Sequence, residues 1–88
     1  FTVKEILDDP SAFNEPIEVV GQVNESVNVL GIKYLKLNDF EYNDKQLLVI
    51  PFSEIVPKKG TPLRVHGYVK QLLKFGDNEW VIFKDLKK

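Results

Sequence analysis

The feature that most constrains this chain is a strict alternation of side chains from residue 63 to residue 70. Apolar or small residues occupy every second position, and Arg64, His66, Tyr68 and Lys70 stand between them. Because successive side chains of a β-strand point to opposite faces, this period of two predicts a strand with one buried face. The four polar or aromatic residues then form a stripe on its outer face.

Four further segments carry strand-like patterns. We expect strands over residues 17–23, 32–37, 46–50 and 80–83, and the intervening stretches 24–30 and 73–78 are expected to be connections. Gly21 interrupts the first strand, which indicates a bulge or a sharp bend. The large aromatic side chains are assigned to the core or its rim: Phe1, Phe13, Phe52, Trp80 and Phe83.

Two short helical segments complete the expected fold. Thr2 and Glu5 have the spacing of a capping box, in which each side chain accepts a hydrogen bond from the other residue's backbone N–H. This predicts a helix over residues 2–8, within an N-terminal plug formed by residues 1–15. Ser53 has the properties of an N-cap, which predicts one helical turn between the third and fourth strands.

Three local motifs carry a resemblance to a known family. Residues 19–23 read V-x-G-x-V, residues 31–39 match G-x-x-Y-x-x-L-x-D, and residues 57–69 follow P-x-x-G-x-x-V-x-V-x-G-x-V, with Leu at the first of its valine positions. The chain thus resembles small bacterial and archaeal OB-fold (oligonucleotide/oligosaccharide-binding) domains of the tRNA-anticodon-binding-like type. The resemblance implies an all-β domain over 1–88, with a five-stranded Greek-key OB-fold barrel in residues 16–88.

The composition argues against catalysis and against a metal site. The chain has one His and no Cys, so few nucleophile–base pairs are available and thiolate ligands are absent. The serines lack a nucleophile-elbow motif, and no His–acid cluster has the spacing of a metal site. We therefore expect a binding module rather than an enzyme, with no cofactor and no metal.

Charge is unevenly distributed along a nearly neutral chain. The net charge is −1, with −6 in residues 1–44 and +5 in residues 45–88. This asymmetry is compatible with one basic face, and equally with solvated charges that have no binding role. The overall basic excess typical of a nucleic-acid-binding domain is absent.

The resemblance places a nucleic-acid strand across the second and third strands, between the loops that join strands 1–2 and 4–5. Tyr34 and Lys36 point outward on that face, and Lys74 and Phe75 lie in the second loop. Lysines attract phosphates and aromatic rings stack on bases, so these four residues are the candidate site for single-stranded DNA or RNA. Alternatively, Tyr34 covers the barrel and Phe75 closes the loop over the core.

The outward stripe of the fourth strand is a second candidate surface. Three of its members, Arg64, His66 and Lys70, can carry positive charge, so the stripe with Tyr68 can serve as a phosphate-binding or partner-binding surface. The alternative is a plain solvated strand face.

Two functions remain open at this point. The first is binding of single-stranded nucleic acid, and the second is a protein-interaction or structural role. The chain begins at Phe1 and contains no Met, so we expect that an upstream segment has been removed. Such a segment leaves an exported or membrane-tethered location open beside a cytoplasmic one.

Overall fold

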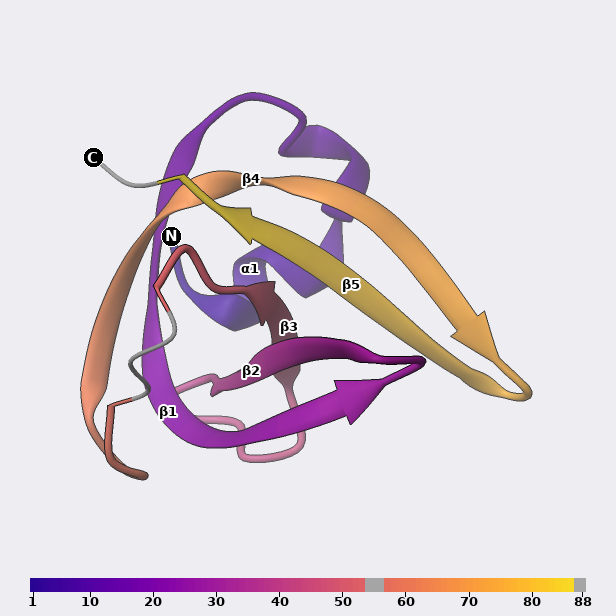
Figure 1. Cartoon of the computed structure of the whole chain (residues 1–88). Helices are drawn as coiled ribbons and strands as arrows, with labels where there is room; N and C mark the ends of the chain where they lie inside the picture. Colours follow the sequence, from indigo (N-terminus) through magenta and orange to yellow (C-terminus); the bar gives the residue numbers. More distant parts are fainter. Residues whose placement is uncertain (54–56, 87–88) are drawn as a thin grey trace.

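The computed structural model describes residues 1–53 and 57–86, except for the side chain of Phe75. The elements follow in the order α1 (Val3–Asp8), η1 (Pro10–Ala12), β1 (Ile17–Val29), β2 (Ile32–Asn38), β3 (Gln46–Ile50), β4 (Pro62–Phe75) and β5 (Asn78–Asp85), as Figure 1 shows. The helical turn expected after Ser53 falls on residues 54–56, which lie outside the described residues.

The strands form one sheet that closes on itself in the order β1-β2-β3-β5-β4. β1 closes the ring because its second half pairs with β2 and its first half pairs with β4, both antiparallel. β3 pairs antiparallel with β2 and parallel with β5, and β5 pairs antiparallel with β4. The all-β class, the closed five-stranded sheet and the short N-terminal helix are thereby confirmed.

β1 and β4 are longer than predicted. Residues 24–29 continue β1 and pair with β2 as far as Val29 opposite Ile32, and β4 continues to Phe75 opposite Asn78. The prediction that 24–30 and 73–78 are connections is therefore wrong outside the two tight turns. The sequence pattern predicted loops here because one face of each hairpin arm is solvated and carries polar side chains. Both hairpins extend toward the same side of the molecule (Figure 1).

Gly21 is required by close packing rather than by a bulge at its own position. A Cβ atom there would lie 2.7 Å from the backbone oxygen of Asn38 and 2.7 Å from Cγ of Leu37. The register shift of β1 against β2 falls later, between Val23 and Ser26. The glycine therefore lets β1 approach β2 where the long strand bends.

Strand alternation produces two apolar clusters, one on each face of the sheet. The inner cluster contains buried residues from all five strands and α1: Val3, Ile6, Val19, Val23, Leu35, Leu37, Leu47, Val49, Val65, Val81 and Phe83. The outer cluster has buried Tyr34, Leu48 and Ile82, with Val27, Val29, Ile50, Leu73 and Trp80 packed against them. The outer cluster exists because the two hairpin arms carry apolar side chains onto the outer face.

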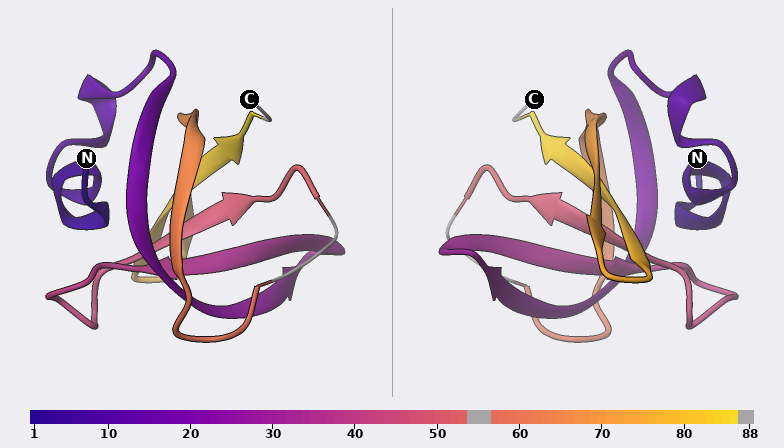
Figure 2. Two further views of the ribbon diagram at one scale, coloured as in Figure 1. Left: turned by 90° about the vertical axis from the view of Figure 1, so that its left-hand side faces the viewer. Right: turned by 90° about the vertical axis from the view of Figure 1, so that its right-hand side faces the viewer.

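The helix α1 is capped as the sequence predicts. Thr2 Oγ1 accepts from the Glu5 N–H at 3.1 Å, and Glu5 Oε1 accepts from the Thr2 N–H at 2.9 Å. The helix lies beside β1, away from the β1–β2 hairpin (Figure 2), and buries Val3 and Ile6 completely. Its first turn is tied to the β2–β3 connection, because Asp39 Oδ1 accepts from the Lys4 N–H at 2.8 Å.

Candidate functional site

An apolar groove of about 220 Å³ opens on the outer face of the sheet, on the outer cluster. It is lined by Val27 and Val29 of β1, Lys36 of β2, Leu48 of β3 and Trp80 of β5, and we call it the hairpin groove. Its walls come from the two hairpins and its floor from the central strands. It lies on the face that the sequence predicted for a ligand.

The register explains how the floor of the groove is built. Lys36 stands opposite Leu48, and Leu48 stands beside Ile82, so the three side chains form one row across β2, β3 and β5. Directly opposed residues share a face of a sheet. Lys36 is thus a cation on an otherwise apolar floor, as the alternation of β2 predicted.

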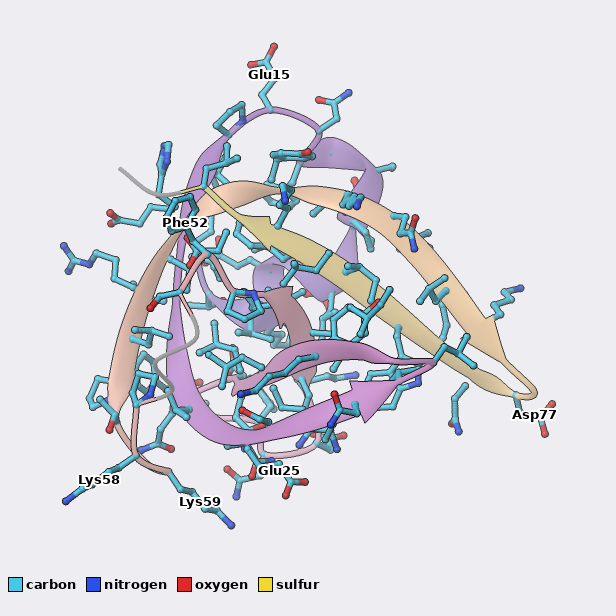
Figure 3. The ribbon with its side chains drawn as sticks, in the orientation of Figure 1. Glu15, Glu25, Phe52, Lys58, Lys59 and Asp77 are labelled. Carbon is cyan, nitrogen blue, oxygen red and sulfur yellow. The ribbon has the colours of Figure 1, made fainter. Side chains whose placement is uncertain are left out.

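Lys36 is held over the aromatic wall of the groove. Its Nζ lies 5.7 Å from the centre of the Trp80 ring, within the range of a cation–π contact, and 3.7 Å from Glu25 Oε1. The Lys36 side chain keeps 21% of its exposure, whereas Glu25 projects from β1 into solvent (Figure 3). The ammonium is therefore oriented in the groove and still reachable from water.

Tyr34 does not fill the role predicted for it. It lies on the same face as Lys36, but only 3% of its surface is exposed. It stands opposite Val27 and packs among the side chains of both hairpin arms. The expectation of an exposed stacking ring is wrong, because the arms fold over this end of β2; the alternative, in which Tyr34 covers the sheet, describes its position.

Trp80 supplies the aromatic surface instead, although the sequence assigned it to the core or its rim. It is partly buried, stands opposite Leu73 in the β4–β5 hairpin, and lines the groove. Lys74 is exposed, stands opposite Glu79 and does not line the groove. The ring of Phe75 lies outside the described side chains, so its predicted role stays a prediction.

A second and wider pocket, of about 900 Å³, lies where β1, β4 and the end of β5 meet. Its lining comprises Glu18, Phe52, Ser53, Arg64, His66, Asp85 and Leu86, and we call it the charged pocket. Arg64 Nε lies 3.4 Å from Glu18 Oε1, and Asp85 Oδ2 accepts from the Phe52 N–H at 3.3 Å. Figure 3 shows Phe52 near the end of β5.

The four residues of the stripe predicted on β4 do not form one surface. Arg64 and His66 line the charged pocket, whereas Tyr68 and Lys70 do not. A register shift between Val69 and Gln71 interrupts the pairing of β4 with β5 at Lys70. Glu18 stands opposite His66 across the β1–β4 ladder, so the stripe has no uninterrupted positive surface.

The described part of the chain contains no group of three or more His, Cys, Asp or Glu side chains that could hold a metal ion. Within the same residues, no helix is long and apolar enough to span a membrane. Comparison of the chain with protein-family models, with curated proteins and with solved structures gave no match.

Proposed function

We propose that this chain is a non-catalytic OB-type domain that binds single-stranded nucleic acid in the hairpin groove. The strand order supports the OB assignment. In a Greek-key OB barrel the first strand pairs with both the second and the fourth, and the third pairs with the fifth. The order β1-β2-β3-β5-β4 has these pairings.

The observation that carries the proposal is the pairing of Trp80 with Lys36 in one groove. An indole offers a stacking surface to a base, and a lysine beside it offers a cation to the adjoining phosphate. The groove volume of about 220 Å³ equals that of roughly seven water molecules at about 30 Å³ each, so the groove can accommodate one base rather than several.

The same geometry limits the affinity. One stacked base contributes about 1–3 kcal/mol. Lys36 is already engaged by Glu25, and the chain's net charge of −1 gives little long-range attraction for phosphates. We therefore expect micromolar or weaker binding that weakens further as salt is raised.

The test uses the fluorescence of Trp80, the chain's one tryptophan. Titration with oligo(dT) and oligo(U) should quench this emission as a base stacks on the indole, and anisotropy of labelled oligomers should report binding at two salt concentrations. Lys36→Gln should weaken binding, whereas Lys59→Gln should not, because Lys59 lies in the loop before β4, away from the hairpin tips (Figure 3). Absence of quenching and of anisotropy change at low salt would refute the proposal.

A second function, a protein-interaction module, is favoured by the tip of the β1–β2 hairpin. Leu30 is 87% exposed and Ile32 is 50% exposed, so two large apolar side chains stand in water at one turn. Ile32 is opposite Val29, which lines the groove, so the apolar surface continues from the groove to the tip. If oligonucleotides fail to bind, this continuous surface becomes the site to test with protein partners.

A further inference from the structure

The charged pocket brings together hydrogen-bonding groups from three strands. Glu18 comes from the first half of β1, His66 from the first half of β4, and Asp85 from the last position of β5. The side chains of Phe52 and Leu86 add an apolar part to the same wall. The pocket is thus built from segments that the closed sheet alone brings together.

Its polar groups have acceptor capacity left over. Glu18 Oε1 contacts Arg64, and Asp85 Oδ2 accepts from the Phe52 N–H. Within residues 1–53 and 57–86, the second oxygen of each carboxylate has no side-chain hydrogen bond or ion pair, so it can accept from another donor. His66 Nδ1 is buried and has no hydrogen-bond partner among the described residues. Buried polar atoms in folded proteins usually have a hydrogen-bond partner, so this nitrogen is an exception.

The charge of the pocket favours a cation. Among the described lining residues, two carboxylates stand beside one guanidinium and one imidazole, so the acids outnumber the one permanent cation. A primary ammonium carries three donors and no acceptor, which matches the acceptor oxygens of Glu18 and Asp85. Phe52 adds an aromatic ring that attracts cations and, with Leu86, an apolar surface for methylene groups.

From these features we infer that the charged pocket binds a primary ammonium on an aliphatic stem, presented by a lysine side chain of a partner peptide. The pocket's volume of about 900 Å³ accommodates the stem and flanking peptide, and far exceeds what a bare ammonium needs. This inference is independent of the hairpin groove, which uses other residues.

Arg64 acts as an internal competitor in this arrangement. Its guanidinium occupies one oxygen of Glu18 while 71% of its side chain remains exposed. Exposed ion pairs of this kind are weak, so an incoming ammonium can displace the guanidinium. Removal of the Arg64 guanidinium should therefore strengthen the binding of an ammonium ligand. The binding of an anionic ligand should instead become weaker, because the pocket would lose its main cation.

The experiment follows backbone amide shifts of ¹⁵N-labelled protein titrated with Nα-acetyl-lysine N-methylamide. Saturable shifts should centre on residues 18, 66 and 85, and the norleucine analogue, which lacks the ammonium, should not produce them. Glu18→Gln and Asp85→Asn should each weaken binding by about tenfold. Arg64→Gln should strengthen it by about threefold. Asp77→Asn, an exposed acid at the β4–β5 turn, is the matched control and should change nothing (Figure 3).

Binding of n-butylamine tests the source of the ammonium. Weaker binding of n-butylamine than of the lysine derivative supports a peptide partner, whereas equal binding would overturn that part of the inference. Equal shifts with the norleucine analogue, or loss of binding in Arg64→Gln, would overturn the ammonium site itself. Trp80→Phe should leave this titration unchanged, so failure here and failure of the oligonucleotide proposal are distinguishable.

Discussion

Replacing Asp39 should destabilise the domain more than any other exchange in the β2–β3 connection. Asp39 is 3% exposed and accepts three backbone hydrogen bonds, from Lys4 at 2.8 Å, Glu41 at 3.0 Å and Tyr42 at 3.2 Å. It therefore fixes its own loop and ties α1 to the sheet. Hydrogen bonds to charged groups contribute about 1.5–3 kcal/mol each.

The expected loss for Asp39→Ala is about 3 kcal/mol, because the N–H groups of exposed Glu41 and Tyr42 can be rehydrated while that of Lys4 is left in a partly buried position. An 88-residue domain has roughly 4–13 kcal/mol of stability in total. The melting temperature should fall by about 12–24 °C, at about 4–8 °C per kcal/mol. Asp44→Asn in the same loop is the control and should cost less than about 0.5 kcal/mol.

The pH dependence gives an independent check. Burial alone would raise the pKa of Asp39, but the three backbone N–H donors outweigh it, and the pKa is lowered from its ordinary value. A carboxyl whose folded pKa lies below its unfolded pKa, about 3.9, stabilises fully above that value and loses its effect as pH falls through the folded pKa.

Urea unfolding of the wild type and of Asp39→Asn at pH 7, 5, 4 and 3 measures this effect. The difference in unfolding free energy between the two proteins should be largest at pH 7 and 5, and should shrink as pH approaches 3. A difference that stays constant over this range, or an equal loss in Asp44→Asn, would refute the role assigned to Asp39.

Two further exchanges test the backbone of the hairpins and of the sheet. Leu30 has φ +52° and Gly31 has φ +81°. Asparagine tolerates such a left-handed conformation better than leucine, so Leu30→Asn should raise the unfolding free energy by about 0.5–1 kcal/mol. A decrease would show instead that the Leu30 side chain makes stabilising contacts. A Cβ on Gly67 would lie 1.9 Å from the Lys84 backbone oxygen, so Gly67→Ala should cost about 3 kcal/mol or more. Gly76→Ala is the comparison: its Cβ meets nothing within 4 Å, so it should cost only the roughly 1–2 kcal/mol of its φ of +62°, and equal losses would contradict the steric argument.

Local pattern was enough to predict the helix α1 and the presence of the five strands, because the period of two and the capping box act within a few residues, but it missed the ends of β1 and β4. The position of Tyr34 shows where local pattern stops. Alternation correctly placed it beside Lys36 on the outer face, but it is buried in the outer cluster, to which one hairpin contributes Val27 and the other Trp80. Burial by side chains of other strands cannot be predicted from the residues next to Tyr34 in the sequence.

The two pockets have the same non-local origin. In the charged pocket, Glu18 meets His66 through the β1–β4 ladder, and Asp85 arrives because β5 ends beside β4. The stripe on β4 looked basic only while its neighbours were unknown, since both carboxylates come from other strands. The closed sheet thus places two carboxylates beside Arg64 and His66 of the β4 stripe, and this mixed charge is the reason why we propose a cation rather than a phosphate as the ligand.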